Sequence, residues 1–192
     1  VVDRNGQIYL PKVGSLSVAG IRYEQLPEHL KSAVGLVFRR FDLRVTLGQL
    51  RSIQILVVGY AHRPGTYTVS SLSTMVNTLF ASGGPSTHGS MRHMELKRGN
   101  RTISDFDMYD LLLKGDKSKD VVLLPGDVIY IPPVGPQVAM AGSVNLPAIY
   151  ELRNTATLAE ELETAGGLSS VADGKRVVVE RIENRTTRKV DE

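Results

Sequence analysis

The sequence predicts an α+β fold in which one structural unit occurs twice in tandem. Residues 54–98 align without a gap to residues 137–181, which lie 83 positions later, with ten identities. Half of the identities are glycine, proline or tyrosine, which fix turns and edges, whereas shared leucine or alanine would only report composition. The repeat markers are Gly59, Pro64, Tyr67, Gly83 and Gly84 in the first copy and Gly142, Pro147, Tyr150, Gly166 and Gly167 in the second.

Each copy begins with two expected strands that form a hairpin. Alternating or continuous apolar residues predict strands over 53–59 and 66–69, and over 138–142 and 149–152 in the second copy. Pro64-Gly65 predicts the turn between the first two strands, because proline presets φ and glycine accepts a positive φ.

A helix is expected next in each copy. Ser73 and Thr155 are the candidate N-caps. The two glycine pairs end the helices, since glycine just past a helix adopts the left-handed conformation at little steric cost. A third strand then covers 94–97 or 177–180. The expected apolar faces of the helices are Val76, Leu79 and Phe80 in the first copy and Leu158, Leu162 and Ala165 in the second.

Only the first copy runs to completion, so we expect the chain to be a fragment that stops partway through the second. Residues 109–115 predict a short helix ended by glycine, 121–124 a strand, and Pro125-Gly126-Asp127 a turn into the strand 128–132. A helix on one face of a small mixed sheet, with hairpins at each end, is the β-grasp arrangement. The repeated Asn100-Arg101-Thr102 and Asn184-Arg185-Thr186 indicate a shared turn.

The first fifty residues predict a smaller module of mixed helix and strand. Asn5-Gly6 is a hairpin-turn sequence before the expected strand 7–10, and extended chain follows as far as Gly20. Apolar spacing predicts a helix over 23–34, and alternation predicts a strand over 43–47. We therefore expect three modules, at 1–50, 51–134 and 135–192.

Composition excludes several classes of function for this stretch. The absence of cysteine among 192 residues removes disulfides, thiol catalysis and iron–sulfur sites. The 23 basic and 20 acidic residues give a net charge of only +3, so nucleic-acid binding is not implied. No apolar run approaches the roughly 18 residues of a membrane-spanning helix.

The sequence predicts no catalytic residues, no cofactor and no metal site. His29, His62, His88 and His93 are scattered over different modules, and their spacing matches no metal-ligand pattern, so we expect surface or loop histidines. Serine and aspartate occur without a nucleophile elbow or a histidine partner. The Gly83-Gly84 sequence follows a helix, whereas a phosphate-binding loop precedes one.

The order of motifs resembles a known family. Residues 57–67, 81–84, 107–116 and 124–133 resemble the soluble-ligand-binding β-grasp (SLBB) domain. Residues 3–14 and 18–20 and the helix at 24–30 are similar to the latter half of the polysaccharide export domain. An export domain followed by tandem SLBB domains is the pattern of Wza-like outer-membrane polysaccharide export proteins.

The resemblance implies a periplasmic, non-enzymatic protein that assembles into a homo-oligomeric ring and forms part of a conduit for capsular or exopolysaccharide. It also implies association with the outer membrane in the full-length protein and a partner among inner-membrane polysaccharide co-polymerases. The alternative is an SLBB module that binds or senses a small ligand or a glycan and forms no conduit.

The densest basic cluster consists of Arg39, Arg40, Arg44 and Arg51. Its hypothetical role is to line a passage for an anionic polysaccharide, because weak and repeated charge contacts let a polymer move. The alternatives are a solvated face and a contact between subunits. Aromatic residues make up only 6% of the chain and tryptophan is absent, which argues against a sugar-stacking platform.

Overall fold

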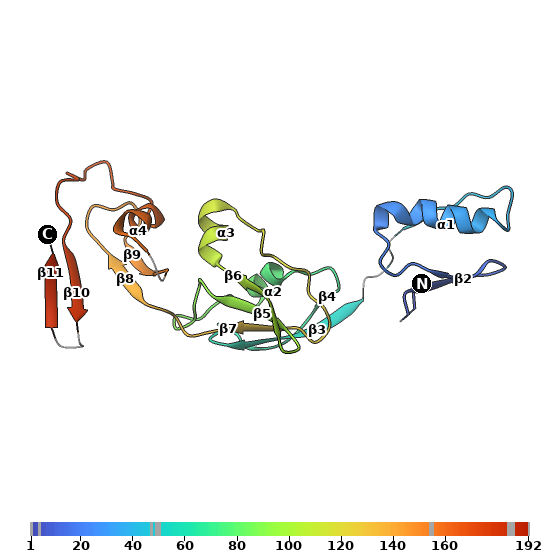
Figure 1. Ribbon diagram of the computed structural model, residues 1–192, viewed down its shortest axis with the longest axis horizontal. Coiled ribbons are helices and arrows are strands. Elements are labelled where there is room, and N and C mark those ends of the chain that lie inside the picture. The colour runs from blue at the N-terminus through green and yellow to red at the C-terminus, as the bar shows by residue number, and fades with distance from the viewer. Residues whose placement is uncertain are drawn as a thin grey trace. The chain divides into compact units, whose positions relative to one another are not determined.

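The computed structural model describes residues 2–3, 5–46, 48, 51–153, 156–183 and 187–191 (Figure 1). The chain divides into two compact units, Val1–Arg51 and Ser52–Glu192. The first unit holds the small N-terminal module. The second holds both copies of the repeat, and we describe each unit by itself.

The N-terminal unit is a hairpin accompanied by a helix. β1 (Gln7–Leu10) pairs antiparallel with β2 (Gly14–Ser17). A 3-10 turn, η1 (Tyr23–Gln25), leads into α1 (Leu26–Gly35), which tolerates Pro27 because its missing N–H falls in the first turn. Of the four apolar positions on which the predicted helix rests, Leu26, Leu30, Ala33 and Val34, the helix buries Leu30 and Val34, and the other two are partly exposed.

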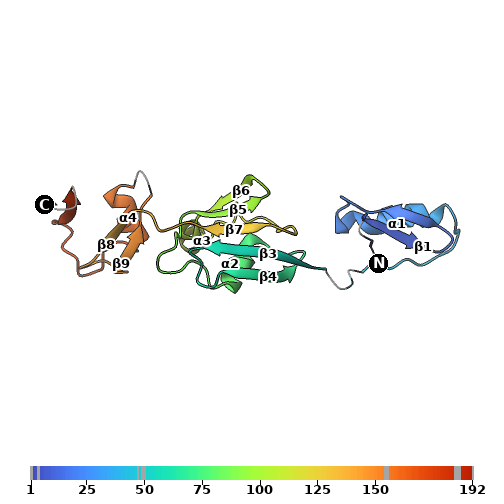
Figure 2. The same cartoon turned by 90° about the horizontal axis from the view of Figure 1, so that it is seen from below.

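The first repeat forms a five-stranded mixed sheet. The strands lie side by side in the order β4-β3-β7-β5-β6, as Figure 2 shows. The central β7 runs parallel to β3 and antiparallel to β5, whereas β4 and β6 form the two edges. The strand bounds are β3 (Ser52–Gly59), β4 (Gly65–Ser70), β5 (Met94–Arg98), β6 (Arg101–Phe106) and β7 (Val128–Ile131).

Two helices complete the first repeat, α2 (Met75–Ala81) and α3 (Met108–Lys114). Strand residues alternate between the two faces of a sheet, so the inward side chains of β3 and β7 meet the apolar side of α2 in one core. The expected α+β class with a β-grasp sheet is confirmed. The buried core consists of Ile53, Ile55, Val57, Ala61, Met75, Val76, Leu79, Met94, Leu96, Phe106, Met108, Leu123, Ile129 and Ile131.

The second repeat has the same opening elements. β8 (Gln137–Met140) and β9 (Ala148–Glu151) form a hairpin, α4 (Leu158–Thr164) follows, and β10 (Val179–Glu183) pairs with β11 (Thr187–Asp191). The internal repeat extends to individual main-chain bonds. His62 N–H donates to Gly84 O at 2.8 Å, and Asn145 N–H donates to Gly167 O, both 83 positions later, at 3.0 Å.

The repeat markers occupy equivalent places in the two copies. Tyr67 Oη donates to Arg63 O at 2.7 Å, and Tyr150 Oη donates to Leu146 O at 2.6 Å. Both glycine pairs adopt positive φ, between 70° and 82°, directly after their helices. Each tyrosine therefore makes the same hydrogen bond across the turn between the two strands of its hairpin.

Several local expectations were wrong. The N-caps of α2 and α4 are Thr74 and Thr157, whose hydroxyls accept from the N–H groups of Asn77 and Glu160, whereas Ser73 lies one residue too early. The other expected cap, Thr155, lies outside the described residues. The capping threonines are identical in the two copies, so the repeat itself could have identified them.

Two expected strands are not formed in the described residues. Residues 43–46 have no strand pairing, and Leu47 lies outside the described residues. The stretch 121–124 contributes a single bridge, from Val122 to Thr74, because Leu123 turns inward to fill the core. The structure also adds β6, which the sequence analysis did not predict.

Two expected core residues of the helices are exposed. The side chains of Phe80 and Leu158 are 58% and 50% accessible. Asn100 does lie in the turn between β5 and β6, but Arg101 and Thr102 already belong to β6. The matching residues 184–186 lie outside the described part of the chain.

Candidate functional site at the junction of the two repeats

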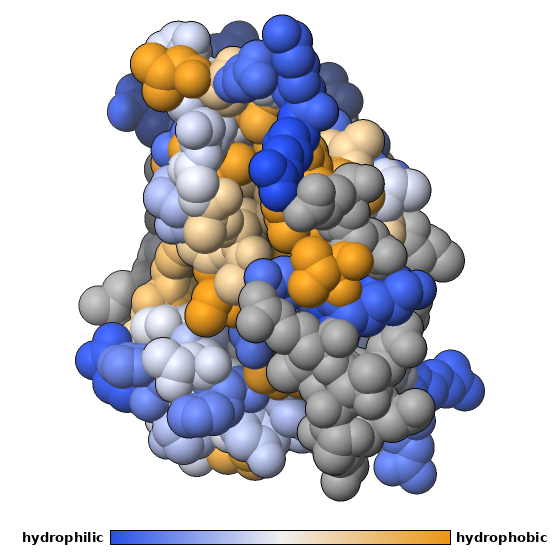
Figure 3. All heavy atoms as spheres, turned by 90° about the vertical axis from the view of Figure 1, so that its left-hand side faces the viewer, coloured by the Kyte–Doolittle hydropathy of each residue, from blue (hydrophilic) through white to orange (hydrophobic). Residues whose placement is uncertain are grey.

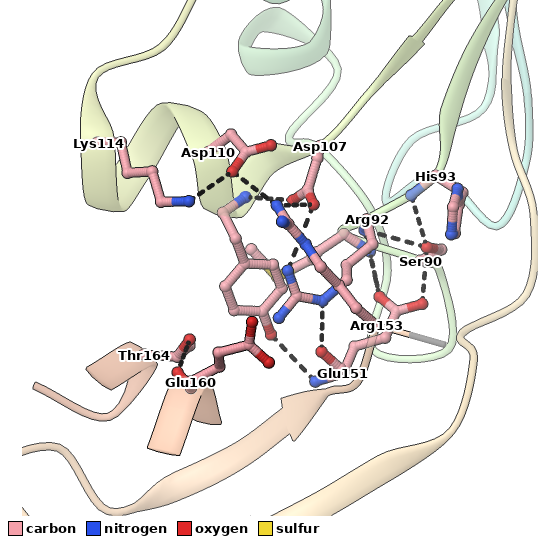
Figure 4. Close-up of polar contacts among 12 residues, drawn as sticks. Ser90, Arg92, His93, Asp107, Asp110, Lys114, Glu151, Arg153, Glu160 and Thr164 are labelled. Atoms are coloured by element: carbon pink, nitrogen blue, oxygen red, sulfur yellow. Dashed lines mark hydrogen bonds and ion pairs between the residues drawn. The ribbon is translucent and has the colours of Figure 1, made fainter. Parts of the chain in front are cut away.

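The side chain of Glu151 joins the second repeat to the first. Its carboxylate accepts a hydrogen bond from Ser90 Oγ at 2.7 Å and from Arg92 N–H at 3.3 Å (Figure 4). It also accepts from the N–H groups of Met91 and Gly135 at 2.7 and 2.8 Å. The residue is only 3% exposed and lies at the last position of β9. Three of the four donors lie in the loop before β5, so the buried carboxylate anchors β9 to this loop of the first repeat.

Arg92 of the first repeat makes a second contact with Glu151 through its side chain. Its Nε donates to the carbonyl of Glu151 at 2.6 Å, and its guanidinium lies 4.1 Å from the centre of the Tyr109 ring. The same guanidinium pairs with Asp107 at 3.3 Å and with Glu161 of α4 at 3.7 Å. A planar guanidinium with several donors suits such a buried crossing point better than lysine would.

Asp107 and Asp110 extend the network along α3. Asp107 caps this helix by accepting from Tyr109 N–H at 2.9 Å, and it also receives Arg153 at 3.0 Å. Arg153 reaches Asp110 at 2.6 Å. Partial burial alone would raise the pKa of Asp110, but the hydrogen bonds and charges of Arg153 and Lys114 outweigh it and hold this pKa below its ordinary value.

A charged cleft of about 280 Å³ opens beside this network. It is lined by side chains from both repeats, and His93, at its edge, pairs with Asp105 at 3.0 Å. The lining residues are Arg92, His93, Asp105, Asp107, Asp110, Lys119 and Arg153. Because both cationic and anionic groups line it, the cleft suits a polar ligand such as a sugar, whose hydroxyls both donate and accept.

The junction holds more buried negative than buried positive charge. Arg92, Asp107, Glu151 and Glu161 are all at least nine-tenths buried, and Glu161 Oε2 lacks a hydrogen-bond partner among the described residues. Removing one partner of such a buried network is expensive, because the remaining charges stay desolvated. The arrangement therefore fixes one repeat against the other.

In the described residues there is no group of three histidines, aspartates or glutamates that could hold a metal ion.

The four arginines singled out from the sequence lie in the other compact unit. Arg39 and Arg40 follow α1, and Arg44 lies in the extended chain beyond it, all with exposed side chains. Within the described residues these three form no hydrogen bond or ion pair. Arg51 differs, since it donates to the carbonyl of Val2 at 3.0 Å.

The histidines are exposed, as expected from the sequence. His29 lies 3.1 Å from the carbonyl of Ser17, which ties α1 to the neighbouring hairpin. His93 is the one that lines the charged cleft.

Sequence reasoning missed the junction residues, although the repeat contains a signal for them. The second copy has Glu151, Arg153 and Glu161 where the first copy has Thr68, Ser70 and Thr78. Conserved markers maintain the shared fold, so charges that occur in one copy only indicate a surface used by that copy alone. Such a comparison would have identified three of the residues that form the junction.

The sequence of this chain matches two protein-family models and several known proteins. The profile of the SLBB domain matches residues 137–191, and the profile described as polysaccharide biosynthesis/export protein matches residues 1–48. The polysialic acid transport protein KpsD of Escherichia coli is 31% identical over 156 residues, which are 80% of this chain and 28% of KpsD. The EPS I polysaccharide export outer membrane protein EpsA of Ralstonia solanacearum is 29% identical over 182 residues, 93% of this chain and 48% of EpsA.

These matches define a chain in which a polysaccharide export segment precedes β-grasp repeats of the SLBB type. The matches support a Wza-like polysaccharide export protein, the family that the motif order indicated. It spans less than a third of the length of KpsD and about half that of EpsA.

Proposed function

We propose that this chain is the periplasmic portion of an outer-membrane polysaccharide export protein and that it acts structurally, without catalysis. The names of its relatives are those of transport and export proteins. The observation that supports a structural role is the buried junction, in which Arg92 of the first repeat donates both its main-chain N–H and its Nε to Glu151 of the second. A fixed angle between repeats presents their outer surfaces in one constant arrangement.

Such a constant arrangement suits assembly into a ring. When unlike surfaces of identical subunits meet head to tail, the contacts close if the rotation between subunits permits. In the proposed assembly the ring surrounds a passage for the polymer, and an inner-membrane co-polymerase is the expected partner. None of the described helices is long and apolar enough to cross a bilayer.

The export role is tested by deleting the parent gene in its host and measuring polysaccharide separately at the cell surface, in the medium and in the periplasm. Polymer that is still synthesised but collects inside the cell supports the proposal. Normal surface polymer contradicts it, as does loss of synthesis. Ring assembly is measured on the purified full-length protein by sedimentation velocity, where a concentration-dependent closed oligomer is expected.

A second candidate function is supported by the charged cleft between the repeats. Its mixture of cationic and anionic side chains favours a module that binds or senses a small polar ligand or a glycan. A monomer that binds an oligosaccharide saturably, with the binding abolished by Arg153→Ala and retained in Lys175→Ala, would favour this function over the conduit. Lys175 is an exposed cation of the second repeat outside the cleft.

A further inference from the structure

All three carboxylates that line the charged cleft lie beside a basic side chain of the protein itself. Asp107 and Asp110 both accept from Arg153, at 3.0 and 2.6 Å, and Asp105 lies 3.0 Å from His93 Nδ1. A cationic ligand would have to displace one of these basic groups and leave it without its partner. The pairing within the cleft therefore argues against a cationic ligand.

The other buried carboxylates of the junction lie outside the cleft. Glu151 and Glu161 are not among its lining residues, and the carboxylate of Glu151 is occupied by four donors of the protein. The charges that a ligand would meet directly are therefore those of the lining residues.

Lys119 is the lining cation that has no counter-ion in the described residues. Its side chain is exposed and forms no hydrogen bond or ion pair there. Its main chain is held in place, because Ser104 Oγ of β6 donates to its carbonyl at 2.6 Å. Asp116, a carboxylate on which Lys119 acts electrostatically, already accepts from Ser118 N–H at 2.8 Å. The ammonium group of Lys119 is therefore available to an anionic group of a ligand.

Arg153 has donors left after it has bound the two aspartates. Both of these contacts use its Nη2 atom, so its Nε and Nη1 atoms donate no hydrogen bond within the described residues. A guanidinium carries five N–H donors in a planar fork that matches the two oxygens of a carboxylate. Lys119 of the first repeat and Arg153 of the second thus offer the cleft two cations with unused donors.

The cleft offers a sugar charges and hydrogen bonds but no aromatic face. None of its lining residues is aromatic. Of the two nearby rings, Tyr109 lies under the guanidinium of Arg92, and Tyr150 is 9% exposed. Figure 3 views the end of the chain that carries the second repeat, where blue hydrophilic side chains lie among orange apolar ones, and the large exposed apolar residues described in this repeat are all aliphatic. Recognition of a sugar here therefore depends on its polar groups.

We propose that the charged cleft binds a sugar residue that carries a carboxylate. The carboxylate lies between Lys119 and Arg153, and the hydroxyls contact His93 and Asp105 at the edge of the cleft. The cleft has a volume of about 280 Å³, near the lower end for ligand pockets, so it holds about one sugar residue and not a length of polymer. This inference rests on the second proposed function, glycan binding by the cleft, and adds the chemical class of the glycan.

The probe is trigalacturonate with an uncharged fluorescent label at its reducing end, titrated with the purified full-length protein and followed by fluorescence anisotropy. The matched ligand is the methyl ester of the same labelled trisaccharide, which keeps the hydroxyls and loses the negative charges. Sodium acetate is the competitor, because it carries a carboxylate without the sugar. We expect trigalacturonate to bind at least about tenfold more tightly than its methyl ester.

The matched variants are Lys119→Met and Lys117→Met, in which methionine keeps an apolar stem and removes the charge. Both lysines lie in the segment between α3 and β7, and both are exposed. Lys117, however, pairs with Asp120 at 3.5 Å and does not line the cleft. We expect Lys119→Met to weaken binding of trigalacturonate by about tenfold and to leave binding of the methyl ester unchanged, whereas Lys117→Met binds both as the unaltered protein does.

The outcomes separate this inference from the function on which it rests. Equal affinity for the two trisaccharides would overturn the acidic class and leave glycan binding by the cleft in place, whereas absence of binding to either would overturn both. Unchanged binding of trigalacturonate in Lys119→Met would overturn the proposal, as would equal weakening in the two lysine variants. Displacement by acetate at an equal concentration of carboxylate would also overturn it, because the site would then recognise the charge without the sugar.

Discussion

Arg92 donates two hydrogen bonds to Glu151 across the junction of the repeats. The side chain of Arg92 donates to the main-chain carbonyl of Glu151 at 2.6 Å, and the main-chain N–H of Arg92 donates to the side chain of Glu151 at 3.3 Å. Each residue thus contributes one main-chain group and one side-chain group to the pair of hydrogen bonds. Relative rotation of the repeats would break both bonds at once, which makes the pair a sensitive reporter of junction integrity.

Glu151→Ala should loosen the second repeat from the first. Ser90 Oγ and the N–H groups of Met91 and Gly135 lose their acceptor, and each buried donor left without one costs about 1–3 kcal/mol before water re-enters. Hydrogen exchange should accelerate at Met91 and Gly135. Glu163→Ala is the control, because this glutamate of α4 is exposed. Unchanged exchange in Glu151→Ala would show that the junction does not depend on the carboxylate.

Acid should weaken the ion pair between Arg153 and Asp110. The pKa of Asp110 is lowered in the folded chain from its ordinary value of 3.8, despite the opposing effect of burial. The contribution to stability is therefore present above about pH 3.8 and is lost as the pH falls through the folded-state pKa. It should not exceed about 1 kcal/mol, because Arg153 is 47% exposed and solvent screens the pair.

The measurement is the free energy of unfolding as a function of pH for the unaltered chain and for Asp110→Asn. The difference between the two should shrink as the pH falls below the ordinary value. A difference that stays constant down to the lowest pH at which the chain folds would mean that the charge of Asp110 contributes nothing.

Asp127→Ala should destabilise the first repeat more than any exposed charge does. Its carboxylate is completely buried, accepts from Arg98 Nε and Nη2 at 2.8 Å each, and also accepts from Leu124 N–H at 2.8 Å. We expect a loss of about 2–4 kcal/mol, below the upper end for a fully buried pair because Arg98 is one-third exposed. Chemical denaturation measures it.

Asp173→Ala is the matched control for that loss. Asp173 also pairs with a cation, Lys175, but both side chains are more than three-quarters exposed, so its removal should cost little. Equal losses in Asp127→Ala and Asp173→Ala would contradict a structural role for the buried pair.

The two repeat tyrosines should respond unequally to loss of the hydroxyl. Tyr67→Phe and Tyr150→Phe each remove a hydrogen bond to the carbonyl four residues earlier, worth about 1 kcal/mol. Tyr150 is 9% exposed and Tyr67 more so, and the carbonyl of Leu146 therefore has less access to water once its donor is gone. Tyr150→Phe should be the more destabilising variant, and the reverse order would contradict this explanation.

The internal repeat made the fold predictable from the sequence. Gly83-Gly84 and Gly166-Gly167 end their helices as expected, and the hairpins formed where Pro64 and Pro147 indicated, because these residues act through local backbone geometry. Strand 121–124 was not formed as predicted, since its apolar pattern reflects burial of Leu123 in the core and no strand pairing. A local apolar pattern indicates that residues are buried, but tertiary contacts determine which element covers them.

The candidate site was less predictable because its residues come from distant segments. Arg92 and Glu151 lie in no motif, and although Asp107 begins the stretch 107–116, nothing in that stretch indicates its partners. The proximity of the three residues follows from packing one repeat against the next. The sequence indicated the arginine cluster as the candidate site instead, because its residues lie near one another in the chain. A cluster of charges that are neighbours in the chain can be recognised from the sequence, whereas a buried network of distant residues can be recognised only once the fold is known.

Charge reversal in the arginine cluster remains the test of its proposed contact with an anionic polysaccharide. The variant Arg39→Glu, Arg40→Glu, Arg44→Glu changes three exposed side chains that have no hydrogen bond or ion pair within the described residues, so folding should be preserved. Arg51 is left unchanged because it donates to Val2 O. In a host that exports an acidic glycan, the variant should slow export, since repeated weak attraction becomes repulsion.

Lys31→Glu provides the first control, because this exposed lysine lies on α1 outside the cluster and its reversal should leave export unchanged. A host that exports a neutral glycan provides the second. A contact between the cluster and the charge of the polymer predicts a defect for the acidic glycan only. An equal defect for both glycans would instead indicate that these arginines lie in a contact between subunits, because assembly does not depend on the charge of the polymer.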